Sequence, residues 1–161
     1  MSYSDELRAQ IAQTDMQLAQ LNADLAQARR ALTKLQELQP YMQHKSTEFD
    51  DRHRKSCNSL MCLQESGISN KSIIGYGNAM QDTLYGNLPN SVYAGYNDAI
   101  VHIQKGIRRV QEEILDFNHS IDSATQYRAE QVQHLNRVLT EEAWEAEQER
   151  KRMEPRRRGD R

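Results

Sequence analysis

Residues 17–38 read QLAQLNADLAQARRALTKLQEL, and this stretch decides the fold. It contains neither glycine nor proline and consists largely of residues with high helix propensity. Its apolar residues recur at alternating steps of three and four, which places them along one side of an α-helix in the heptad pattern of coiled coils. We therefore predict a long helix whose apolar stripe packs against another helix.

The stripe continues beyond this stretch in both directions. Its first part comprises Leu7, Ile11, Thr14, Leu18, Leu21, Leu25, Ala28, Leu32 and Leu35. The same phase then runs through Gln39, Met42, Ser46, Phe49, His53, Ser56, Leu60 and Leu63, where polar members weaken it. Ser4 is the predicted N-cap. Pro40 cannot donate a backbone hydrogen bond, so we expect a kink or short break near it. The first helical arm should cover about residues 4–64.

A second stripe of the same kind follows Pro89. Its members are Tyr93, Tyr96, Ile100, Ile103, Ile107, Val110, Ile114, Phe117, Ile121, Ala124, Arg128, Gln131, Leu135 and Val138. Asn90 or Ser91 is the predicted N-cap, so the second arm should cover about residues 91–152. Two arms of similar length predict an all-α fold, a long antiparallel, coiled-coil-like helical hairpin. The alternative is that each arm pairs with an arm of another chain.

Residues 65–90 separate the arms and contain several glycines, which mark a corner. We predict a short helix around residues 78–85 and turns elsewhere, with glycines that allow positive φ angles or close backbone approach. Ile73, Ile74 and Tyr76 are expected to close the open end of the helix pair. The alternative is a recognition tip that contacts another protein.

The stretch SIIGYGN at residues 72–78 resembles the selectivity loop of a potassium channel. A channel needs spanning helices of about 20 apolar residues, and no apolar run here approaches that length. The start, MSYSDELRAQ, has no basic segment followed by an apolar one, so we expect no Sec-type signal peptide. These features predict a cytoplasmic protein without a transmembrane segment.

The composition predicts a thin hydrophobic core. Hydrophobic residues make up 37% of the chain, charged residues make up 27%, and the mean hydropathy is -0.89. Soluble domains typically contain about 45–50% apolar residues. A chain with so few apolar residues should be elongated or should complete its core with a partner.

The residues that could support catalysis or metal binding are not arranged for either. Cys57 and Cys62 project about 140° apart around a helix, so they are not expected to form a disulfide. His53 stands four residues before Cys57, but two ligands do not make a structural metal site. The carboxylates fall on solvent-facing sides of the predicted helices. We predict no metal, no cofactor, no small-molecule substrate and no enzymatic activity.

The C-terminal region carries two further features. Residues 153–161, MEPRRRGDR, form a basic tail that we expect to be disordered, with binding to nucleic acid or an acidic membrane surface as the alternative. Trp144 lies in the acidic segment EEAWEAEQER. It is either an interface anchor, a common role for tryptophan, or it packs near Tyr3 and Leu7.

The first stripe from Leu7 to Leu38, which ends in ALTKLQEL, and the second stripe from Ile100 to Val138 resemble those of the small helical proteins of bacterial type VII secretion. Within that class the chain is similar to the YwqH-like group, which is encoded beside LXG polymorphic toxins. Small type VII substrates carry Trp-x-Gly at the hairpin turn, whereas this chain has Leu84-Tyr85-Gly86. Their export tag, Tyr-x-x-x-Asp/Glu, is absent, because Tyr127 is followed by Glu130 one position too early.

The resemblance implies an adaptor or targeting chaperone that bundles with the helical N-terminal region of an LXG toxin, with export together with that toxin as an alternative to a cytoplasmic location. Independently of this resemblance, the polar residues within the stripes leave a small hydrophobic core for two helices alone. This favours a helical protein partner or a homodimer. The residues expected to contact that partner are Leu18, Leu21, Leu25, Leu32, Leu84, Tyr85, Gly86, Ile107, Ile114, Phe117 and Trp144. The alternatives are a homo-oligomeric structural coiled coil, such as a spacer or phage-assembly part, and a nucleic-acid or membrane-surface binder acting through the tail.

Overall fold

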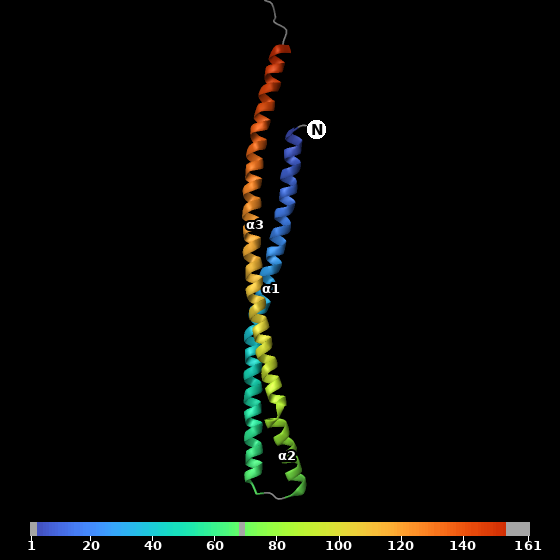
Figure 1. The fold of residues 1–161 in the computed structure, drawn as a ribbon. Helices are drawn as coiled ribbons and strands as arrows, with labels where there is room; N and C mark the ends of the chain where they lie inside the picture. The colour runs from blue at the N-terminus through green and yellow to red at the C-terminus, as the bar shows by residue number, and fades with distance from the viewer. Residues whose placement is uncertain (1–2, 68–69, 154–161) are drawn as a thin grey trace, which may run out of the picture. The chain divides into compact units, whose positions relative to one another are not determined.

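The computed structural model describes residues 3–67 and 70–153. These residues form three α-helices and no strand: α1 (Tyr3–Glu65), α2 (Lys71–Tyr85) and α3 (Asn87–Met153), shown in Figure 1. The prediction of an all-α helical hairpin with a short helix in its corner is confirmed. Of the predicted basic tail, residues 154–161 lie outside the described residues.

The chain divides into two compact units. The terminal unit consists of Met1–Gln27 and Ile114–Arg161, and the corner unit consists of Ala28–Glu113 with the whole of α2. Within each unit the segments of α1 and α3 run antiparallel. Thr14 meets Gln131 in the terminal unit, and Phe49 meets Tyr93 in the corner unit. A single domain over residues 1–152 stays a prediction.

Both predicted stripes lie on the inner sides of the helices, since every member is buried or partly buried. Most of the stripe residues are only partly buried, as expected from the low content of hydrophobic residues. Among the described residues, the buried apolar ones are Leu7, Leu25, Ala28, Leu60 and Ile103. In the corner unit, Gly106 of α3 faces Leu35 of α1, since a Cβ at Gly106 would lie in ordinary contact distance, 3.4 Å, from Leu35 Cδ1.

The helix starts differ from their predicted positions. Helix α1 begins at Tyr3, so Ser4 lies inside the helix and is not the N-cap; its side chain is buried, three residues before Leu7. Helix α3 begins at Asn87, which places Pro89 in its first turn. Proline is tolerated there because the first N–H groups of a helix have no intrahelical partner. The predicted N-caps at Asn90 and Ser91 are therefore wrong.

Pro40 does not break the first arm, because α1 is one helix from Tyr3 to Glu65 with Pro40 inside it. The proline lacks an N–H, so the carbonyl of Gln36 loses its intrahelical hydrogen bond. Pro40 is exposed, which leaves that carbonyl accessible to water. The helix therefore continues through Pro40, and the predicted short break near this residue is wrong.

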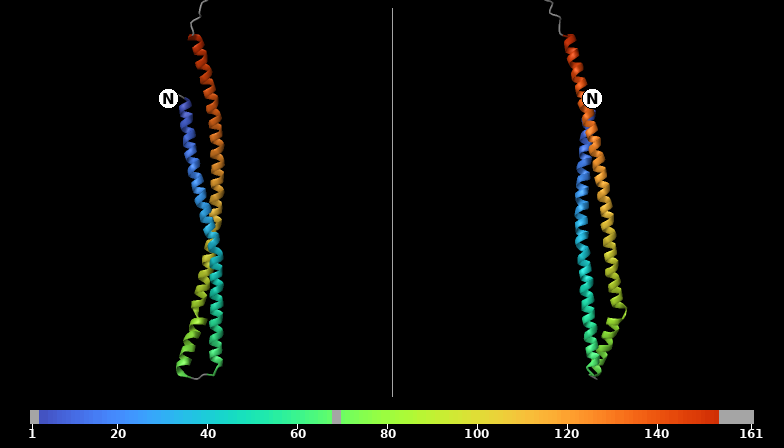
Figure 2. Two further views of the ribbon diagram at one scale, coloured as in Figure 1. Left: turned by 180° about the vertical axis from the view of Figure 1, so that it is seen from behind. Right: turned by 90° about the vertical axis from the view of Figure 1, so that its left-hand side faces the viewer.

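Helix α2 is longer than predicted and includes the IIGYG segment. Asn70 caps it, since its Oδ1 accepts a hydrogen bond from the N–H of Ser72 at 2.9 Å. Gly75 and Gly77 are helical, so they do not supply turns. Among the described residues of the corner, the positive φ angle belongs to Gly67, at 66°, two residues after the end of α1. Figures 1 and 2 show α2 alongside the last turns of α1.

Gly86 forms the junction between α2 and α3 through close approach. Its φ of -82° is accessible to any residue, but a Cβ would lie 2.3 Å from the carbonyl oxygen of Asp82. The replacement Gly86→Ala is therefore expected to displace the end of α2, with a loss of about 1–3 kcal/mol in the free energy of unfolding. Urea denaturation followed by circular dichroism measures this loss. Gly95→Ala is the matched control, because a Cβ at Gly95 meets no atom within 4 Å. An equal effect of both replacements would contradict the prediction.

Candidate functional site

The stripe residues that we expect to contact a partner lie on the inner sides of α1 and α3, but these helices do not cover them completely. Leu25 is buried, whereas Leu18, Leu21, Leu32, Ile107, Ile114 and Phe117 keep part of their surface accessible. Leu115, which follows the stripe residue Ile114 in the sequence, is exposed, with 59% of its surface accessible. Within each unit, the two helices thus leave part of the stripe surface accessible to solvent.

The terminal unit contains a buried polar layer within its stripe. The Thr14 hydroxyl lies 3.0 Å from the carbonyl oxygen of Gln10 and 3.1 Å from Oε1 of Gln131. Gln131 Nε2 donates to the side-chain oxygen of Gln10 at 3.3 Å. Thr14 and Gln131 are both buried, and their polar groups are satisfied by the hydrogen bond between them together with those to Gln10. Such a layer favours one register of α1 against α3.

An ion pair flanks this layer, where Arg128 donates to the carboxylate of Asp15. The hydrogen bond and the positive charge of Arg128 lower the pKa of Asp15. Both side chains are more than 40% exposed, so solvent screens the attraction. The ion pair therefore contributes more to the orientation of α1 relative to α3 in this unit than to the free energy of folding.

Trp144 does not pack on the start of α1. The ring of Tyr3 contacts His134 instead, with ring centroids 5.7 Å apart, and Trp144 lies ten residues further along α3 with 63% of its surface exposed. Figures 1 and 2 show α3 continuing past the start of α1. The prediction that Trp144 packs near Tyr3 and Leu7 is wrong, and the interface role stays a prediction.

The predicted tip residues lie where α2 meets α3. Leu84 is partly buried, Tyr85 is 62% exposed, and Gly86 forms the junction. The carbonyl oxygen of Leu84, in the last turn of α2, accepts a hydrogen bond from Nε2 of His53 at 2.8 Å. The stripe thus supplies a histidine that caps a helix end, a function that its spacing alone does not reveal.

His53 belongs to a polar network that joins all three helices of the corner unit. Its Nδ1 lies 3.4 Å from the Tyr93 hydroxyl, and that hydroxyl donates to Asp50 at 2.8 Å. The Sγ of Cys57 lies 3.6 Å from His53 Nε2. Phe49 stacks on His53 with an interplanar angle of 4° and contacts the Tyr93 ring edge-on.

The network shifts the acidities of its members. The hydrogen bond from Tyr93, followed by that from Arg54, lowers the pKa of Asp50, and a positive charge on His53 acts in the same direction. The same bond to Asp50 raises the pKa of Tyr93. The pKa of Tyr85 is also raised, chiefly because its hydroxyl hydrogen-bonds the Cys57 thiol.

These shifts predict an acid-sensitive contribution from Asp50. Because its folded-state pKa is below the ordinary value of 3.8, its contribution is present above that value and is lost as the pH falls through the lower, folded-state value. Thermal unfolding from pH 7 to pH 2 should therefore show a smaller acid-induced decrease in Asp50→Asn than in the unmodified chain. Asp98→Asn, on the exposed side of α3, should follow the unmodified chain. Identical curves for all three proteins would exclude the contribution.

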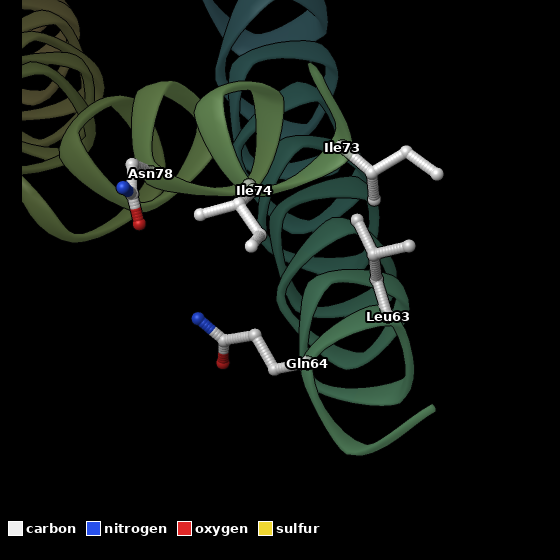
Figure 3. Close-up of a pocket in the computed structure, with 6 residues that line it drawn as sticks. Leu63, Gln64, Ile73, Ile74 and Asn78 are labelled. Carbon is white, nitrogen blue, oxygen red and sulfur yellow. The ribbon is translucent and has the colours of Figure 1, made fainter. Parts of the chain in front are cut away.

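A hollow of about 200 Å³ lies between the end of α1 and the start of α2, lined by Leu63, Gln64, Ile73, Ile74, Gly77 and Asn78. Figure 3 shows Leu63 beside Ile73, with Gln64 and Asn78 on the other side of Ile74. Ile73 therefore helps to cover the end of α1, as predicted. Ile74 and Tyr76 remain 49% and 61% exposed, so they do not close the helix pair.

Within residues 3–67 and 70–153, no three His, Cys, Asp or Glu side chains are grouped to hold a metal ion. No helix in this part of the chain has the length and apolar character needed to cross a bilayer. Comparison of the chain with family models, curated proteins and solved structures finds no match. The geometry of the site is thus the basis for a functional assignment.

Proposed function

We propose that this protein is a non-enzymatic helical adaptor whose incompletely covered stripes pack against helices of a protein partner. The observation that carries the proposal is the shallow burial of the stripes, in which Leu60 is the one large side chain with less than 2% relative exposure among the described residues. Covering apolar surface contributes about 25 cal/mol per Å². Additional helices against the same stripes would therefore stabilise the hairpin and create an interface together.

The resemblance to YwqH-like proteins supplies the identity of the proposed partner, the helical N-terminal region of a type VII-secreted LXG toxin. The adaptor would hold that region in a helical bundle before or during export. The polar layer of Thr14 and Gln131 supports this role, since a fixed register presents one defined surface to the partner.

Co-expression with the N-terminal region of an LXG toxin from the neighbouring gene tests the proposal. A stable complex is expected in size-exclusion chromatography with light scattering. Leu115→Glu should weaken that complex at least tenfold by placing a charge on exposed apolar surface, while circular dichroism shows an intact helical fold. Ser120→Glu introduces the same charge at an exposed polar position and should bind normally. A folded protein that does not bind the toxin segment would refute the adaptor role. Self-association without binding to the toxin segment would favour a structural coiled coil.

A further inference from the structure

We propose that the hollow between the end of α1 and the start of α2 is a binding site for one aliphatic side chain of an uncharged peptide segment. Of the residues that line it, only Leu63 belongs to an apolar stripe, so this surface differs from the one that the proposed toxin partner would cover. The inference concerns the corner unit alone and does not depend on that partner.

Gly77 borders a space that the chain itself leaves unfilled. It is the one buried residue within α2, all of whose residues are described, yet a Cβ at this position would meet no atom within 4 Å. Glycine weakens the interior of a helix relative to alanine, and packing inside the corner unit does not require it here. Because Gly77 also lines the hollow, this unfilled space is open to a group from another molecule.

The size of the hollow fits one side chain. Its volume is about 200 Å³. A cavity of about 150 Å³ lined by leucine, isoleucine and phenylalanine admits benzene, so a leucine-sized group can enter here. Sites for whole small molecules usually occupy about 300–1,000 Å³, which exceeds the space available.

One part of the lining is aliphatic. Leu63 and Ile73 lie beside each other in Figure 3, and Ile74 borders the same hollow with 49% of its surface exposed. An aliphatic side chain that enters the hollow would remove the exposed surface of Ile74 from water, which is favourable.

The other part of the lining consists of side-chain amides. Gln64 and Asn78 lie on the other side of Ile74 (Figure 3). Gln64 donates one hydrogen to the side-chain oxygen of Gln81 at 3.3 Å, and a primary amide has a second hydrogen and an acceptor oxygen. A peptide backbone likewise offers one donor and one acceptor in each residue. The two amides can therefore bond the backbone on either side of the inserted side chain.

The surroundings of the hollow favour an uncharged ligand. Between Glu65 and Asp98 the sequence contains two charged residues, Lys71 and Asp82, and neither lines the hollow. A charged side chain that entered would lose its water without gaining an opposite charge. An aliphatic side chain has no such cost, and its peptide groups can be satisfied by the amides.

An NMR titration of the unmodified chain with N-acetyl-L-leucinamide tests the site, because this probe carries one aliphatic side chain between two peptide groups. The methyl signals of Leu63, Ile73 and Ile74 and the side-chain amide signals of Gln64 and Asn78 should shift and saturate. The dissociation constant should be on the order of 1 mM, as expected for so small a ligand. N-acetylglycinamide, which lacks the side chain, and N-acetyl-L-lysinamide, which carries a charge, should each bind at least tenfold more weakly.

Gly77→Leu fills the hollow from within and should abolish the response to N-acetyl-L-leucinamide. Gly75→Leu is the matched control: it makes the same replacement in the same helix, at an exposed position that does not line the hollow, and should bind the probe normally. Circular dichroism checks that both variants remain helical.

The two probes that lack an aliphatic side chain keep the proposal falsifiable even if a variant fails to fold. Shifts that do not saturate, or that N-acetylglycinamide produces equally well, would overturn the proposal. A stronger response to N-acetyl-L-lysinamide would assign the hollow to a charged ligand and would overturn it as well. Undiminished binding in a folded Gly77→Leu variant would show that the probe binds elsewhere.

Discussion

Replacing Leu60 with alanine is expected to lower the free energy of unfolding by about 2–5 kcal/mol, the range typical of buried leucine truncations. Leu60 is 2% exposed and lies one turn before Leu63, which faces α2 across the corner. The shorter side chain loses its own burial and leaves a cavity that the surrounding helices can fill only in part. Urea denaturation monitored by circular dichroism measures the loss.

Met61→Ala provides the matched comparison, because Met61 is adjacent in sequence but 49% exposed. Its effect should remain within about 0.5 kcal/mol, as is usual for surface positions. If both truncations cost the same, Leu60 would not be the packing centre of the corner unit.

Thr14→Val is the second large expected effect, a loss of about 1–3 kcal/mol. The valine removes the hydroxyl that donates to Gln131 Oε1 at 3.1 Å and leaves that buried oxygen without this donor. The Thr14→Val/Gln131→Leu double variant removes both polar partners, and it should regain most of the lost stability because the layer becomes apolar. Thermal and urea unfolding of the single and double variants give the coupling energy directly.

Thr33→Val serves as the control for the threonine replacement, since Thr33 is exposed and its hydroxyl bonds only a backbone carbonyl of its own helix, that of Arg29. It should change stability little. A double variant no more stable than Thr14→Val would indicate that the polar layer does not act as a pair.

The sequence by itself determined the two long helices and the sides on which they pack. Alternating steps of three and four leave one apolar side on each helix, and helices bury that side whatever the detailed contacts are. Every residue of both stripes, from Leu7 to Leu63 and from Tyr93 to Val138, lies on the inner side as the spacing predicts. Local periodicity is sufficient here because it depends only on helix geometry.

Only the tertiary structure decided the corner and its polar contacts. Glycines in IIGYG favour a turn locally, yet the segment is helical, because Asn70 caps α2 and Leu63 packs beside Ile73. Likewise, spacing placed His53 in the stripe but could not reveal that Leu84, 31 residues away, presents a carbonyl to it. Contacts between distant residues depend on how the helices meet, and helix periodicity carries no information about that.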